Sequence, residues 1–222
     1  ICATQALGGI PVPMYQDSVA AEMAYPIQNA GIAFAMVEDQ EQVDKLLEIL
    51  PQCPSLKRIC YDEPRGMRHY AQEQLMDYEK LIALGREYDK THPDFYAGEV
   101  AKGSGADTAS MFFTSGTTGH PKGVVLTHTA LIDRALAAAK MEGLDETEEV
   151  LAYLPPAWIG QNIFSYAQPY VTGYCICCPE SSETVMSDMR EIGPTYYFAP
   201  PRVLEALLTQ VSIRMEDASA LK

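Results

Sequence analysis

Residues 114–122 read TSGTTGHPK, a run of hydroxyl side chains and glycines that ends in one lysine. It lies between two apolar stretches. Closely spaced backbone N–H groups, hydroxyls and a point charge suit the oxygens of a phosphate group, and glycine permits backbone angles that other residues avoid. The candidate phosphate-binding residues are Thr114, Ser115, Gly116, Thr117, Thr118, Gly119 and Lys122. We expect this loop to be exposed, and mobile when no ligand is bound.

Two other interpretations of the loop are weighed against phosphate binding. The Walker pattern GxxxxGK[ST] does not fit, because the second glycine, counted from Gly116, falls on Pro121 and the residue after Lys122 is Gly123. A hairpin turn that only links two strands remains open, since turns favour Gly, Ser and Thr. Composition alone does not separate that turn from a phosphate loop.

The longer string from Met111 to Gly123 resembles the signature of the adenylate-forming superfamily, which includes acyl-CoA synthetases, nonribosomal adenylation domains and firefly luciferase. The matching positions are Met111, Thr114, Ser115, Gly116, Thr117, Thr118, Gly119, Pro121, Lys122 and Gly123. Three more segments resemble the family in the same order, at 8–46, at 154–160 (LPPAWIG) and at 194–207. All 222 residues align with the middle of the large N-terminal domain, and the long-chain fatty acyl-CoA synthetases resemble the chain most.

The resemblance implies an ATP-dependent ligase. A carboxylate, which this subgroup implies is a fatty acid, attacks ATP to give acyl-AMP and pyrophosphate. Coenzyme A then takes the acyl group. ATP, Mg²⁺ and coenzyme A are thus the implied small molecules, and the loop holds the β- and γ-phosphates. Adenylation of an aryl or amino acid, and a non-catalytic relic of the fold, stay open as alternatives.

Two positions near these motifs need separate interpretation. Trp158 stands where the family motif has a histidine, so it either shapes the acyl pocket or is a core tryptophan at the start of a helix. His120 occupies a position that the family leaves free, and we assign it no catalytic role.

The family motifs YGxTE and TGD, which bind adenine, metal and ribose, do not occur in the chain. The chain also does not begin with Met. We therefore interpret residues 1–222 as an internal fragment of a longer enzyme, and we expect this piece alone to be inactive.

The remaining sequence alternates short apolar runs with amphipathic segments. This alternation predicts an α/β fold with mostly parallel sheet layers flanked by helices. Strands are predicted at 9–15, 32–37, 56–61, 109–113, 123–127, 150–154, 174–178 and 195–199. Helices are predicted at 19–29, 40–50, 129–140, 159–171, 182–192 and 201–215, with another inside 70–88 that carries Leu75. Polar residues 89–108 are interpreted as a surface connection and a candidate junction between two subdomains.

Composition excludes several classes of protein. A formal net charge of −14 disfavours a nucleic-acid binder, which needs a basic face. The six cysteines show no disulfide framework, because three fall in one apolar run, GYCICCP, and the others are scattered. No apolar run is long enough to span a membrane. These features predict a cytoplasmic protein, with peripheral membrane contact as an option for an enzyme of fatty acids.

Overall fold

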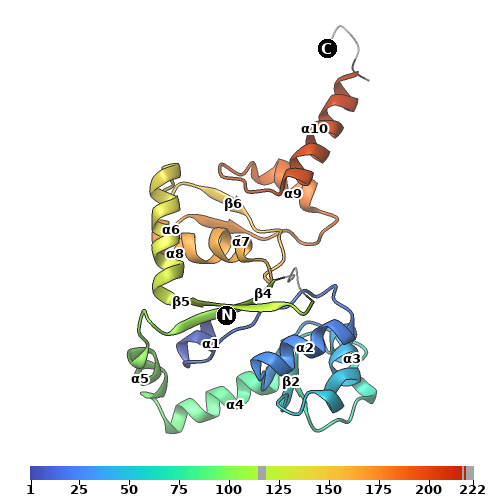
Figure 1. Cartoon of the computed structure of the whole chain (residues 1–222), viewed down its shortest axis with the longest axis vertical. Coiled ribbons are helices and arrows are strands. Elements are labelled where there is room, and N and C mark those ends of the chain that lie inside the picture. Colours follow the sequence, from blue (N-terminus) through green and yellow to red (C-terminus); the bar gives the residue numbers. More distant parts are fainter. Residues whose placement is uncertain (115–118, 217, 219–222) are drawn as a thin grey trace. The chain divides into compact units, whose positions relative to one another are not determined.

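The computed structural model describes residues 1–114, 119–216 and 218 (Figure 1). The chain forms two compact units. Unit 1 comprises Ile1–Arg134 and Leu154–Asn162, and unit 2 comprises Ala135–Tyr153 and Ile163–Lys222. The segment 89–108 lies wholly within unit 1, so its role as a subdomain junction stays a prediction.

Three parallel strands form one sheet of unit 1. In order across the sheet they are β1 (Phe34–Val37), β2 (Arg58–Tyr61) and β3 (Leu75–Asp77). Ile59 in the central strand pairs with Ala35 on one side and Leu75 on the other. Because parallel neighbours need a crossover connection, helix α3 (Gln40–Ile49) joins β1 to β2. The predicted α/β class is confirmed.

The core of this part of unit 1 packs helices α2 (Ala20–Ala30) and α3 beside β2 (Figure 1). Val43, Leu46 and Ile49 recur at helical spacing on α3 and are all buried. At the start of the helix, the Asp39 carboxylate accepts a hydrogen bond from the backbone N–H of Gln42 at 3.2 Å. This cap satisfies one of the free donors of the first turn.

A second sheet of unit 1 is an antiparallel hairpin. It consists of β4 (Thr108–Thr114) and β5 (Lys122–Thr127), with Thr114 opposite Lys122. The predicted strand at 9–15 does not form a regular strand in the structure. Its Pro11 carbonyl accepts only a single backbone hydrogen bond, from Met111 at 3.1 Å. The prolines at 11 and 13 explain this, because proline has no N–H to donate to a ladder.

Several shorter or more polar elements of unit 1 differ from the prediction. Leu75 belongs to strand β3 and not to the helix that follows, α4 (Tyr78–Thr91), because the helix begins only after Asp77 caps it. Helix α5 (Phe95–Lys102) lies within 89–108, the segment interpreted from the sequence as a surface connection. The remaining elements are α1 (Cys2–Ala6), short 3₁₀ helices at Leu50–Gln52 and Met67–His69, α7 (Ile159–Asn162) and α6 (His128–Glu142), which runs into unit 2.

Unit 2 contains a small parallel sheet of β6 (Glu149–Leu151) and β7 (Cys175–Cys177). The predicted strand at 195–199 is wrong as a strand, since only Tyr196 forms an isolated bridge, to Val150. The other helices are a π-helical turn (Ile163–Ala167), α8 (Gln168–Thr172), α9 (Val185–Ile192) and α10 (Pro201–Glu216). None of the described helices is long and apolar enough to cross a membrane.

Candidate phosphate-binding site

The β4–β5 hairpin sets the two ends of the candidate phosphate loop. Thr114 is the last residue of β4, Lys122 is the first of β5, and the two pair in register. Directly opposite residues of an antiparallel pair project from the same face of the sheet. Both residues are exposed. The structure therefore brings one hydroxyl and one ammonium group to the same edge of the hairpin.

Gly119 has a backbone conformation that favours glycine, with φ of +117°. A side chain here would be strained even though no atom lies within 4 Å of the Cβ it would carry. Gly119 and His120 are exposed, as expected for this loop. Ser115, Gly116, Thr117 and Thr118 lie outside the described residues, so their part in the site stays a prediction.

Gly123, the last residue of the motif, has a packing role. It pairs with Phe113 across the hairpin. A Cβ at this position would lie 3.1 Å from Met111 Sδ, so the Met111 side chain would have to shift slightly, and 3.5 Å from Phe113 Cζ, which is an ordinary contact. The glycine at position 123 thus lets β5 pack closely against the side chains of β4.

Tyr25 was not singled out from the sequence. This residue of α2 stacks on the imidazole of His120, with ring centroids 4.5 Å apart and an interplanar angle of 14°. No sequence signal links the two residues, because they are far apart in the chain and the loop motif leaves position 120 free.

Trp158 precedes α7 and packs inside its own segment. A Cβ on the buried Gly160 would lie 2.3 Å from an atom of the Trp158 ring, so the indole lies directly against the glycine. The buried amide of Asn162 donates hydrogen bonds to the carbonyls of Pro156 and Trp158, which closes the turn. This contact gives Trp158 a structural role, and its part in an acyl pocket stays a prediction.

Aromatic side chains of the segment after α9 pack against other parts of unit 2. Phe198 stacks on Phe164 at 3.9 Å, and Tyr197 stacks on Tyr153 at 5.5 Å. Burial raises the pKa of Tyr153, and the neighbouring Tyr197 hydroxyl raises it further. The Tyr153 phenol is therefore neutral at neutral pH, and its ring acts as a packing group.

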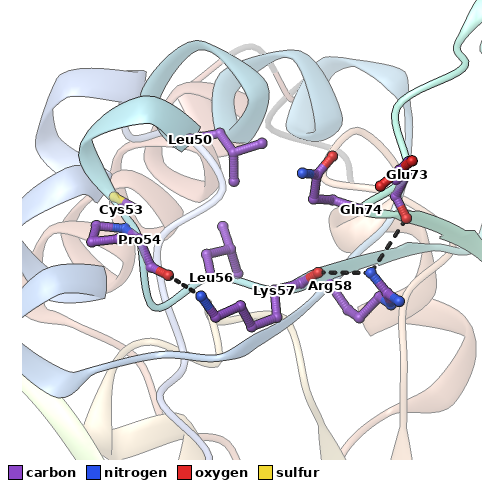
Figure 2. Close-up of a pocket in the computed structure, with 8 residues that line it drawn as sticks. All are labelled: Leu50, Cys53, Pro54, Leu56, Lys57, Arg58, Glu73 and Gln74. Atoms are coloured by element: carbon purple, nitrogen blue, oxygen red, sulfur yellow. Dashed lines mark hydrogen bonds between the residues drawn. The ribbon is translucent and has the colours of Figure 1, made fainter.

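A cavity of about 620 Å³ lies elsewhere in unit 1, at the amino ends of β2 and β3 (Figure 2). Its cations are engaged with backbone, since Lys57 donates to the Pro54 carbonyl and Arg58 to the carbonyls of Lys57 and Glu73. Ligands of open α/β sheets bind at the opposite, carboxyl ends of the strands. None of the predicted site residues lines this cavity, and we do not assign it a role in the reaction.

Among the residues that the structure describes, no group of three or more His, Cys, Asp or Glu side chains could hold a metal ion. The Mg²⁺ implied by the resemblance therefore finds no cage of protein ligands in this part of the chain.

The chain is similar to curated long-chain-fatty-acid–CoA ligases. It is 28% identical to ACSBG2 of Xenopus laevis, over 97% of the chain and 29% of that relative. Identity to ACSBG2 of Homo sapiens is 29%, over 97% of the chain and 32% of the relative. The chain thus spans about a third of the length of these relatives.

Solved structures share the fold. The crystal structure of a long-chain-fatty-acid–CoA ligase (FadD1) from Archaeoglobus fulgidus superimposes with a TM-score of 0.68 and 17% identity, over 95% of this chain and 38% of that one. The crystal structure of an anthranilate CoA ligase in complex with anthranoyl-AMP gives a TM-score of 0.65 and 22% identity, over 87% of this chain and 36% of that one. The AMP-binding enzyme family matches residues 1–222. The chain therefore belongs to the family of AMP-binding enzymes, the adenylate-forming group that its loop motif resembles.

Proposed function

We propose that the full-length protein is an ATP-dependent, AMP-forming ligase that joins a long-chain fatty acid to coenzyme A. In this proposal the β4–β5 hairpin binds the β- and γ-phosphates of ATP. The observation that supports it best is the pairing of Thr114 with Lys122 across the ends of a loop whose Gly119 has a positive φ.

The reaction has two steps. A carboxylate oxygen of the fatty acid attacks the α-phosphorus of ATP, the bond from that phosphorus to the bridging oxygen of the β-phosphate breaks, and pyrophosphate leaves. The sulfur of coenzyme A then attacks the acyl carbon of acyl-AMP. AMP leaves with the electrons of the acyl–oxygen bond, and the thiol proton passes to solvent or to a base.

The hairpin residues act on the first step. Negative charge grows on pyrophosphate as it leaves, and hydrogen-bond donors held at that position stabilise it. Lys122 supplies a positive charge there, and the Thr114 hydroxyl together with the hydroxyls and N–H groups of 115–119 supplies donors. ATP enters as its Mg²⁺ complex, so the metal arrives with the substrate.

The choice of a fatty acid rests on the similarity to long-chain-fatty-acid–CoA ligases, and Trp158 is the proposed wall of the acyl pocket. The indole stands where the family motif has a histidine, so it bears on the size of the acyl pocket, and adenylation of an aryl or amino acid is the second candidate. Cys53, Cys60, Cys175, Cys177 and Cys178 form no disulfide. This supports a place in the cytoplasm, with peripheral contact to the membranes that hold fatty acids.

A substrate screen of the purified full-length protein tests this function. Pyrophosphate release is measured with MgATP and carboxylic acids of increasing chain length, plus aryl and amino acids, and acyl-CoA is then measured after addition of coenzyme A. We expect the highest kcat/KM for long-chain fatty acids. A preference for aryl or amino acids would replace the proposed substrate, and no release with any acid would favour the non-catalytic relic.

A further inference from the structure

Tyr25 of α2 contacts the two segments that flank the phosphate loop. We call them the stems: the first is the end of β4, and the second is residues 119–122. Its ring packs edge-on against Phe113 of β4, with centroids 6.4 Å apart and an interplanar angle of 82°. The same ring stacks on His120, after the loop, at 4.5 Å and 14°. We propose that Tyr25 is a positioning residue that fixes both stems of the loop and thereby orients Lys122 toward ATP. This role rests on the proposed function.

The helix that carries Tyr25 is firmly held. Its neighbours Met23, Ala24 and Ile27 are buried in the core of unit 1, with 1–7% of their surface exposed. The Tyr25 ring, half-buried between helix and hairpin, is therefore a fixed support and not a freely moving side chain. Edge-on and stacked aromatic contacts are also directional, so they restrain the orientation of the rings they touch.

The second stem needs such a support more than the first. Phe113 is already held within the β4–β5 ladder, where it pairs with Gly123. His120 precedes the ladder and follows Gly119, whose backbone has a φ of +117°. Pro121 then fixes one backbone angle before Lys122 begins β5. When His120 is stacked, the backbone between it and Lys122 has few possible conformations, and the position of Lys122 is restricted accordingly.

Flanking residues that are held in place before the ligand arrives lose less entropy on binding. Loss of the Tyr25 ring should therefore weaken binding of ATP and leave binding of the carboxylic acid unchanged. The family motif fixes no residue type at position 120, but through this stack His120 still contributes to the site in our proposal. His120 acts through its ring plane, and its contact with Tyr25 requires no proton transfer.

The test uses Tyr25→Leu, Tyr25→Phe and His120→Ala in the full-length protein. Tyr25→Leu should raise KM for MgATP by roughly three- to tenfold, the scale of one aromatic contact, with KM for the acid unchanged. Tyr25→Phe keeps the ring and should remain within about twofold of the wild type. In the double variant Tyr25→Leu/His120→Ala, KM for MgATP should rise no further than in the single variant with the larger effect, because both changes remove the same contact.

A matched control exists in the same chain. Tyr88 stacks on His92 at 4.1 Å and 8°, in an exposed part of α4 and its end. Tyr88→Leu removes an equivalent stack outside the hairpin and should leave KM for MgATP unchanged. An equal rise in this control would mean that the effect is general and would overturn the positioning role.

Other outcomes separate the two proposals. If the wild type releases no pyrophosphate, the proposed function fails and the role of Tyr25 fails with it. If the wild type is active and KM for MgATP is unchanged in Tyr25→Leu, only the positioning role is overturned, as it is by additive effects in the double variant. Should Tyr25→Leu not fold, His120→Ala, at an exposed position, decides by the same KM comparison.

Discussion

At the scale of single residues, the site depends on where the hairpin ends. Lys122 and Thr114 lie opposite each other because the ladder of β4 and β5 starts with this pair. The loop motif singled out both residues from the sequence, and the structure places them at the paired ends of β4 and β5, one residue beyond the predicted strands. Their role in phosphate binding stays a prediction. The contact between Tyr25 and His120 could not be predicted, because it is made by a side chain of a distant helix to a motif position of no fixed type.

Lys122→Ala in the full-length protein should lower kcat/KM for pyrophosphate release by roughly 5- to 150-fold. This corresponds to about 1–3 kcal/mol for one charged donor at a developing anion. Stability should hardly change, because the side chain is exposed. Lys140→Ala, which removes another exposed lysine in the last turn of α6, is the control and should keep full activity. Equal activity of both variants would argue against a role of Lys122 in phosphate binding.

Gly160→Ala should destabilise the full-length protein by about 1–3 kcal/mol, because the added methyl group would overlap the Trp158 ring. Unfolding in urea measures the change in free energy. Gly85→Ala is the control, since no atom lies within 4 Å of the added Cβ in α4 and alanine favours helix. It should be neutral or slightly stabilising. A second change, Trp158→Leu, should offset part of the Gly160→Ala cost, and a simple sum of the two costs would contradict the overlap.

At the scale of elements, long segments with a clear period were predicted well and short ones were not. The prediction of a helix at 40–50 is confirmed as Gln40–Ile49, because Val43, Leu46 and Ile49 share one face. The three-residue strand β3 was missed, since three residues carry no readable period. The apolar run of β1 is typical of a buried strand, yet Phe34 and Met36 are 46% and 49% exposed. It is an edge strand of its sheet, and the apolar sequence does not reveal that.

Asp39→Ala should destabilise the protein by roughly 0.5–2 kcal/mol, the usual cost of a lost helix cap. The Asp39 carboxylate accepts a hydrogen bond from the N–H of Gln42 in the first turn of α3. Asp94 precedes α5 in the same way but makes no such side-chain bond, so Asp94→Ala is the matched control and should cost less. Urea unfolding of both variants gives the comparison, and equal costs would show that the cap of α3 is not the cause.

At the scale of the whole molecule, the alternating pattern predicted the fold class but not the division into units. Residues 154–162 belong to unit 1 although both neighbouring segments belong to unit 2. That division depends on contacts between segments distant in the sequence, and a local hydrophobic period contains no information about such contacts. Ring contacts could not be predicted for the same reason. The stacks of Phe164 on Phe198 and of Tyr153 on Tyr197 join segments on either side of β7.

Two tyrosines of unit 2, the buried Tyr174 and the half-buried Tyr196, predict how stability depends on alkaline pH. Burial, and next the nearby Glu142 carboxylate, raise the pKa of Tyr174 and of Tyr196. Ionised phenolate is thus harder to form in the folded protein than in the unfolded chain, where the pKa is about 10. The stability that these groups contribute is fully present below about pH 10 and is lost as pH rises through the higher folded pKa. We expect the free energy of unfolding to fall above about pH 10.

Tyr174→Phe separates this effect from simple packing. The single proton of the Tyr174 hydroxyl is shared between the Phe164 carbonyl and Gln168 Oε1, so loss of the hydroxyl should cost about 1–3 kcal/mol at pH 7. The variant has no phenol to ionise, and its stability should therefore fall less steeply than that of the wild type above about pH 10. Urea midpoints measured from neutral to alkaline pH give both slopes. Tyr96→Phe, at a side chain that is 58% exposed, is the control and should keep the slope of the wild type. A Tyr174→Phe slope equal to that of the wild type would place the alkaline sensitivity in other groups.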